Sequence, residues 1–225
     1  MSDNAVVLPN SFDEVVIDKS KERPPLTATA EQLTRMLDVI EKEVLPKTEQ
    51  GVKDGNKVFG AAVLGSNWET VHADTNSETT CPLFHGEVKL IYEWSKLVPA
   101  NERGPAAQSS IFLSTHEPCC MCISSILWAG FTKVYYFFPY SITSAQGIPH
   151  DINTMHELWG VDSYRKRNKY ISTACIMDLI DQLDDEESKT TLKAKQQRLM
   201  DAYDQLSNKY HSEKAQNKNN SLVLG

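Results

Sequence analysis

Two short segments of the 225-residue chain combine residue types that could bind a metal ion and move protons. The first is His85-Gly86-Glu87, and the second, Pro118-Cys119-Cys120-Met121-Cys122, places Cys119 34 positions after His85. One imidazole and two thiolates are a common ligand set for zinc, and three protein ligands leave a fourth position open for water. Such an open position is typical of catalytic rather than structural zinc. We therefore predict a Zn²⁺ site formed by His85, Cys119 and Cys122.

The spacing of these residues requires that each segment begins a helix. Cys119 and Cys122 are three apart, so they share one face of a helix and can reach the same ion. The free N–H groups of a first turn should favour their thiolate forms. His85 and Glu87 are two apart and converge only if His85 is the N-cap and Glu87 lies in the first turn.

The paired motifs H-x-E and P-C-x-x-C resemble the signature of the cytidine deaminase-like superfamily of zinc-dependent deaminases. The resemblance is strongest to the branch of yeast-type cytosine deaminases, bacterial guanine deaminases and tRNA adenosine deaminases, and covers roughly residues 28 to 140. It implies a three-layer α/β/α sandwich with a mixed central sheet of about five strands. It also implies a homodimer in which the partner helps to wall the pocket.

The same resemblance implies a mechanism, in which zinc lowers the pKa of a bound water so that hydroxide forms near neutral pH. Glu87 would take the proton and pass it to a ring nitrogen and then to the departing amine. The hydroxide would attack the carbon that bears the amino group, and ammonia would leave. Glu87 is therefore the predicted catalytic residue, and the backbone N–H of Cys119 would help to hold the reacting water.

Substrate contacts are less clearly indicated by the sequence. The branch places an asparagine upstream of the metal histidine to bind the substrate base, and Asn76, nine residues before His85, is the best match. A turn residue is an equally good interpretation of Asn76. Phe84 is a second predicted substrate contact because it could stack on a flat heterocycle, as could Tyr140 and Trp159, although packing explains each of them as well.

Other residues near the motifs have simpler interpretations. Cys120 should face away from the ion and pack in the core, and Cys175 lies in an apolar run and should be buried. Cys81, four residues before His85, is an alternative fourth ligand that would close the site. His116 is expected in the wall of the site rather than on the metal.

The remaining pattern predicts alternating strands and helices, which favours helices on both faces of a sheet. Thr29 and Gln32 have capping-box spacing before a helix that Pro46 should end or kink. The expected strands are 58–64, 69–73, 111–114 and 134–138, and the expected helices after the first run from His85 to Pro99, from Pro118 to Gly130, over 151–159 and over 188–210. A polar loop is expected over 101–109.

We predict a surface arm over residues 1–26, a deaminase domain over 27–175, and a helical extension with a disordered tail over 176–225. The chain has neither a secretory signal nor an apolar run long enough for a membrane span, so the cytoplasm, or else the nucleus, is expected. Five cysteines, three of them within four positions, suit a metal site in a reducing compartment.

The net charge of −7 favours a small-molecule substrate over a nucleic acid. The compact basic cluster, Arg165-Lys166-Arg167 with Lys169, is too short to follow a phosphate backbone and is expected to be a solvated turn. We therefore expect hydrolytic deamination of a nucleobase, nucleoside or related small aminoheterocycle. The alternatives are a tRNA or other nucleic-acid base-editing deaminase, or its subunit, and a silent partner that keeps zinc for structure, which the presence of Glu87 argues against.

Overall fold

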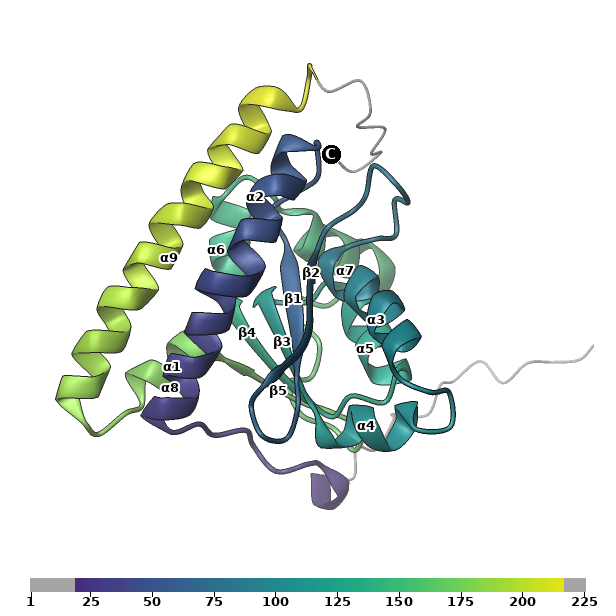
Figure 1. Cartoon of the computed structure of the whole chain (residues 1–225), viewed down its shortest axis with the longest axis vertical. Coiled ribbons are helices and arrows are strands. Elements are labelled where there is room, and N and C mark those ends of the chain that lie inside the picture. Colours follow the sequence, from purple (N-terminus) through teal and green to yellow (C-terminus); the bar gives the residue numbers. More distant parts are fainter. Residues whose placement is uncertain (1–18, 217–225) are drawn as a thin grey trace, which may run out of the picture.

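The computed structural model describes residues 19–216 and arranges them as a five-stranded sheet between two layers of helices (Figure 1). The strands lie in the order β2-β1-β3-β4-β5. β1 is antiparallel to β2 and β3, whereas β3, β4 and β5 are parallel to one another. Their bounds are Gly60–Leu64 (β1), Thr70–Thr75 (β2), Ile111–His116 (β3), Lys133–Phe138 (β4) and Ser172–Cys175 (β5). The predicted three-layer sandwich with a mixed sheet is confirmed.

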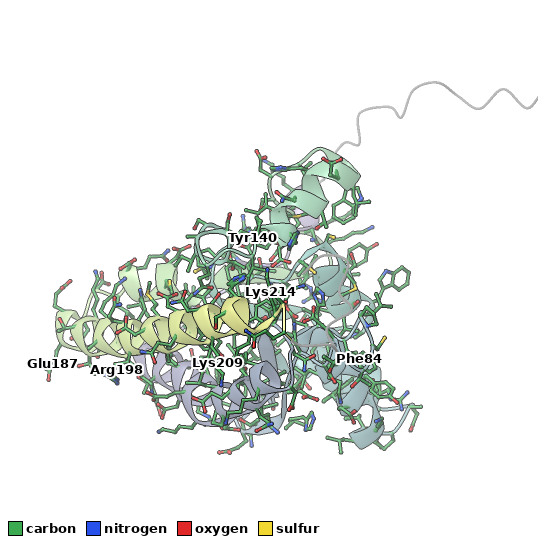
Figure 2. All side chains as sticks on the ribbon, turned by 90° about the horizontal axis from the view of Figure 1, so that it is seen from above. Phe84, Tyr140, Glu187, Arg198, Lys209 and Lys214 are labelled. Carbon is green, nitrogen blue, oxygen red and sulfur yellow. The ribbon has the colours of Figure 1, made fainter. Side chains whose placement is uncertain are left out.

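One face of the sheet is covered by helices from both ends of the described chain (Figure 1). These are α1 (Ala30–Val39), the π-helical segment η2 (Ile40–Val44), α2 (Leu45–Lys53), α8 (Ile176–Asp181) and α9 (Glu186–Glu213). Figure 2 shows α9 extending along this layer from Glu187 to Lys214. The buried residues Leu192, Leu199 and Tyr203 of α9 share one apolar cluster with residues of α1 and the sheet.

The opposite face carries the helices that begin at the two predicted motifs. These are α3 (Gly86–Leu97), α4 (Arg103–Ser109) and α5 (Cys120–Trp128), and α7 (His150–Trp159) lies beside α5. The short helix α6 (Tyr140–Ala145) connects β4 to this region. Leu90 and Trp94 of α3 and Ile126 of α5 pack on Val63 and Phe112 of the sheet. This packing fixes α3 and α5 next to each other, so their first turns can meet.

The first helix confirms one local prediction and corrects another. Thr29 and Gln32 form the expected capping box at the start of α1. Pro46 does not end the helix, because it occupies the first turn of α2, where its missing N–H is tolerated. A π-helical turn precedes it, and helical backbone continues through Gly51 to Lys53.

Other elements also differ from the sequence prediction, among them the short helix α6, which was not expected. The polar segment expected as a loop contains α4, whose buried Ala107 packs in the cluster beneath α3 and α5. The strand β5 was not predicted, because Ser172 to Cys175 is short and has no apolar alternation. It is stabilised by parallel pairing with β4, a tertiary contact.

The described part of the N-terminal arm packs against the chain. A short 3₁₀ turn, η1 (Lys19–Lys21), leads to Arg23, whose backbone N–H donates to Asn168, and the Ser172 hydroxyl donates to the carbonyl of Pro24. The rest of the predicted arm (1–18) and most of the predicted tail (217–225) lie outside the described residues. The predicted division into arm, domain and extension stays a prediction. Within residues 19–216, no helix has the length and apolar character that a membrane crossing requires.

Candidate metal and catalytic site

The two motifs meet through the starts of two neighbouring helices. His85 is the N-cap of α3 and Cys119 is the N-cap of α5, and both have extended backbone dihedral angles. Glu87 is the second residue of α3 and Cys122 the third of α5. Both helices therefore have the start that the spacing predicted, and Gly130, at φ 93°, lies at the predicted glycine end of α5.

Three side chains converge at this point to form a donor group. The Nδ1 atom of His85 lies 3.7 Å from the Sγ atoms of both Cys119 and Cys122. All three donor atoms lie within 4.8 Å of one another. Tetrahedral zinc with its usual bond lengths would hold a nitrogen and a sulfur roughly 3.5 Å apart. The donor types and their separations therefore fit a zinc ion.

The protonation of the thiols differs from the sequence expectation. Burial raises the pKa of the Cys122 thiol to about 12, and the nearby Glu87 carboxylate acts in the same direction. Because a metal binds the thiolate, zinc would have to displace these protons.

Glu87 is buried next to the donor group. Its carboxylate lies beside the Cys122 thiol, and the Ser114 hydroxyl donates to its Oε1 atom over 3.1 Å. Ser114 comes from β3, and the strand ends shortly before the Pro118-Cys119 segment. The carboxylate is thus held in one orientation at the carboxyl end of β3, within reach of the metal ligands.

A cavity of about 200 Å³ opens in front of the donors. Its walls bring together side chains from four separate segments of the chain: Lys57, Phe59, Pro82, Leu83, His85, Cys119, Cys120, Met121, Ile148, His150, Asp151 and Thr154. The aromatic ring in this wall is that of Phe59, whose plane is inclined by 29° to that of His85 at a centroid distance of 6.5 Å. The cavity is small beside the roughly 300–1,000 Å³ of drug-sized ligand sites, so it suits a ligand smaller than those.

The predicted substrate contacts are placed differently from one another. Asn76 is buried just after β2, where its Oδ1 accepts from the Gly86 N–H and its Nδ2 donates to Glu78. Phe84 stacks on Tyr92 at 5.4 Å and is not among the residues lining the cavity.

The other two aromatic residues considered for stacking also lie elsewhere. Tyr140 is buried and donates its hydroxyl to the carbonyl of Pro118, so it holds the loop before Cys119. Trp159 is 54% exposed at the end of α7. Neither residue lines the cavity. Phe59 does line it, directly before β1, but it was not predicted as a site residue because nothing in the neighbouring sequence marks it as one.

The remaining cysteines and His116 do not join the donor group within residues 19–216. Cys120 is buried against Tyr140 and Met155, as expected of a packing residue, but it also lines the cavity beside Cys119. Cys175 is buried in the main core. Cys81 lies in the turn before His85 and is outside the group, so the site keeps an open position. His116 is fully enclosed behind the site, where Thr115 and Gln146 contact its two ring nitrogens.

Three charged residues of the site were not found from the sequence. Glu78 is buried behind His85, Lys57 pairs with it, and Asp151 enters the cavity wall from α7. Burial, reinforced by the negative charge of Glu87, raises the pKa of Asp151 to about 7. Glu78 lies in a polar loop and Asp151 in a short amphipathic helix, and in sequence both resemble many surface carboxylates. Only the fold shows that these two residues belong to the site.

The basic cluster lies in a loop in which Arg165, Arg167 and Lys169 are exposed, as expected of a solvated turn, and three of its cations also form ion pairs within the chain. Arg165 and Arg167 both pair with Glu22 of the N-terminal segment, and Lys166 pairs with the buried Glu117. The Lys166 ammonium also lies over the ring of Tyr164 at 4.2 Å. The charges of these three cations are therefore partly offset by acidic side chains of the same chain.

Comparisons with known proteins agree with the geometry of the motifs. Residues 37–138 match the model of the cytidine and deoxycytidylate deaminase zinc-binding region. None of the curated protein sequences compared with the chain matches it.

Solved structures with similar folds include a guanine deaminase from Nitrosomonas europaea, at 15% identity and a TM-score of 0.46 over 77% of this chain and 87% of that one. A guanine deaminase from Bacillus subtilis is 22% identical with a TM-score of 0.44, over 70% of this chain and 91% of that one. A tRNA:A34 deaminase is 12% identical with a TM-score of 0.41, over 68% and 97%. Residues 37–138, which contain both motifs, thus match the zinc-binding region of cytidine and deoxycytidylate deaminases.

Proposed function

We propose that the protein is a zinc-dependent hydrolase that deaminates a small aminoheterocycle, such as a nucleobase or nucleoside, and releases ammonia. The observation that carries this proposal is the convergence of His85, Cys119 and Cys122 beside the buried Glu87 carboxylate. Three donors without a fourth protein ligand suit a catalytic rather than a structural ion. Zinc held there would supply the Lewis acidity that makes a water molecule nucleophilic near neutral pH.

Glu87 has the position of the proton carrier in this reaction. Ser114 holds Oε1, which orients the carboxylate so that it can accept a proton from the attacking water. Glu87 then delivers that proton to a ring nitrogen and transfers the next one to the departing amine. One water is consumed, one C–N bond is broken and ammonia leaves, with an oxygen in place of the amino group.

The cavity supports a substrate with a small, flat ring. A volume of about 200 Å³ leaves little room beyond one heterocycle. Phe59 offers an aromatic face, and Asp151 and Lys57 offer polar groups of opposite charge in the same wall. Asn76 remains a proposed substrate contact through reorientation of its amide. Phe84 would require a movement of its segment to reach a substrate.

Ammonia release across free bases, nucleosides, nucleotides and related aminoheterocycles tests the proposal, with Glu87→Gln as the matched blank. The expected result is release from at least one compound by the zinc-loaded protein, together with a loss of at least about 100-fold in Glu87→Gln, the lower range for a general acid–base group. Glu87→Gln should retain one zinc per chain. Equal activity of the two proteins would contradict the assignment of Glu87.

A nucleic-acid-editing role is the second candidate, and the structure offers it little support among the described residues. Arg165, Lys166 and Arg167 are engaged in ion pairs with acidic side chains of the same chain. Salt-dependent binding of tRNA would favour this alternative, and zinc binding without turnover on any substrate would favour a silent subunit. The expected homodimer and the expected cytoplasmic location remain predictions, which sedimentation and cell fractionation can test.

A further inference from the structure

A buried carboxylate, Glu78, lies directly behind the metal histidine. Its side chain is 0% exposed and belongs to the loop between β2 and α3. A carboxylate removed from water is unfavourable unless charges and hydrogen bonds compensate for the lost hydration. The contacts of Glu78 therefore indicate what this residue does for the site.

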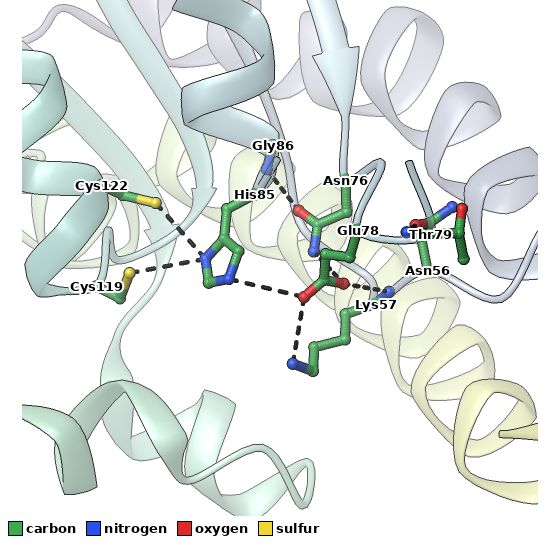
Figure 3. A network of polar contacts seen from close by, with 9 residues as sticks. All are labelled: Asn56, Lys57, Asn76, Glu78, Thr79, His85, Gly86, Cys119 and Cys122. Carbon is green, nitrogen blue, oxygen red and sulfur yellow. Dashed lines mark hydrogen bonds and ion pairs between the residues drawn. The ribbon is translucent and has the colours of Figure 1, made fainter. Parts of the chain in front are cut away.

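Lys57 compensates the charge of Glu78 from the segment before β1. The Lys57 ammonium lies 3.2 Å from Oε1, and the Lys57 backbone N–H donates to Oε2 over 3.1 Å (Figure 3). The Lys57 side chain is itself only 7% exposed. The pair thus fixes the position of the carboxylate and leaves it little freedom to rotate.

The fixed carboxylate faces the ring nitrogen of His85 that points away from the sulfurs. Oε1 lies 3.6 Å from Nε2, whereas Nδ1 faces the two cysteine sulfurs at 3.7 Å each (Figure 3). A neutral imidazole carries its proton on one nitrogen and a lone pair on the other. A carboxylate beside Nε2 favours the proton there, which leaves the Nδ1 lone pair directed at the metal position.

The same carboxylate also reaches the first turn of α3. Asn76 donates from Nδ2 to Oε2 of Glu78 over 2.9 Å, and its Oδ1 accepts from the N–H of Gly86. Gly86 stands between His85 and Glu87. Glu78 is therefore connected to the metal ligand directly and to the catalytic segment through one amide (Figure 3).

We propose that Glu78, neutralised by Lys57, is a positioning residue that sets the tautomer and orientation of His85 for zinc binding. This inference rests on the proposed zinc site, and it does not depend on which substrate the protein uses. Carboxylates that orient a metal-bound histidine typically contribute 10- to 100-fold to metal affinity.

Zinc affinity, measured by competition with a chromogenic chelator, tests the proposal. Glu78→Gln should weaken zinc binding by about 10- to 100-fold. Because that variant leaves the Lys57 charge buried, the double variant Lys57→Met/Glu78→Gln removes both charges and should show the same loss. Glu78→Asp, which keeps the carboxylate, should recover part of the affinity.

The matched control is Asp38→Asn. Asp38 pairs with Lys195, whose side chain is 11% exposed, in the helix layer on the other side of the sheet. The loss of this ion pair should affect stability but leave zinc affinity within about twofold of the wild type, because distant sites act independently. Unchanged affinity in folded Glu78→Gln and in the double variant would overturn the proposal.

Nitrogen-15 NMR of the histidine rings gives a test that requires no variant. In the zinc-loaded wild type, His85 should carry its proton on Nε2 and bind through Nδ1. Zinc on Nε2, or a proton on Nδ1, would refute the proposed role. Neither measurement uses substrate, so a failure of the proposed deaminase activity would leave this result unchanged.

Discussion

Gly86 at the start of α3 packs directly against the backbone of Gly60 at the start of β1. A Cβ atom on Gly86 would lie 2.8 Å from the Cα of Gly60 and 3.1 Å from the carbonyl oxygen of Phe59. Both of these neighbours are backbone atoms in a buried strand or next to it, so they cannot rotate aside. The absence of a side chain at position 86 therefore allows His85 and Glu87 to lie against the sheet.

Gly86→Ala should lower the free energy of unfolding by about 1–3 kcal/mol, the usual cost of overpacking a dense core. It should also weaken zinc binding, because α3 must move away from β1 and carry His85 with it. Chemical denaturation and chelator competition measure the two effects. Gly104→Ala is the control, since a Cβ there meets nothing within 4 Å, and it should be neutral or slightly stabilising. Normal zinc affinity in Gly86→Ala would contradict this explanation.

The three clustered cysteines should respond differently to substitution. Cys119→Ala and Cys122→Ala each remove a donor from the metal group, so the purified variants should hold much less than one zinc per chain. Cys120→Ala should retain the metal, because Cys120 contacts Thr154 and the Tyr140–Met155 cluster instead. Metal analysis of the three proteins, purified side by side, decides the assignment, and loss of zinc in Cys120→Ala would refute it.

The donor group was predictable because its constraints are local. At a helix start, Cys119 and Cys122 lie on the same side because they are three positions apart. His85 must be the N-cap of its helix if its side chain is to converge with that of Glu87. The H-x-E and P-C-x-x-C spacings therefore carry their geometry with them. The alternation of strands and helices likewise indicated the sandwich before the strand order was known.

The rest of the site depends on contacts that the sequence does not encode locally. Glu78 and Lys57 are 21 positions apart and face each other only after β1 and β2 have paired. Asp151 reaches the cavity because α7 packs on α5. Phe84 was a reasonable substrate contact by position, yet the turn before His85 directs its ring toward Tyr92. Side-chain direction in a loop is set by its surroundings.

The buried His116 predicts a loss of stability in acid. Burial lowers the pKa of His116 to about 3, whereas an exposed histidine titrates near 6.5. Between these values the unfolded chain binds a proton that the folded protein excludes, so stability should fall by about 1.4 kcal/mol per pH unit as the pH decreases. His116→Gln should flatten this part of the denaturation profile between pH 6 and 4. A wild-type slope in the variant would contradict the prediction.

Asp151 predicts the opposite trend in the metal-free protein. Its folded-state pKa of about 7 exceeds the usual aspartate value of 3.8, so between these pH values the folded protein retains a proton that the unfolded chain releases. This contribution to stability is complete below about pH 4 and is lost as the pH rises through 7. The free energy of unfolding of Asp151→Asn, relative to that of the wild type, should therefore increase with pH and become constant above neutrality.

Denaturation in the presence of a chelator, at several pH values, measures the effect of Asp151→Asn. The exposed Asp184 provides the control, because Asp184→Asn should leave the pH profile unchanged. If the free energies of unfolding of Asp151→Asn and the wild type differed by a constant amount from about pH 4 to 7, the Asp151 carboxyl group would not be desolvated in the folded protein.

The packing of α9 affects how natural variation in this chain should be interpreted. Its residues Leu192, Leu199, Tyr203 and Tyr210 belong to the same apolar cluster as Val58 and Phe138, although the matched family region ends at residue 138. Selection on α9 therefore acts first on whether the protein accumulates in the cell, since small losses of stability change abundance several-fold. Variants in this helix should therefore change the amount of folded protein in the cell.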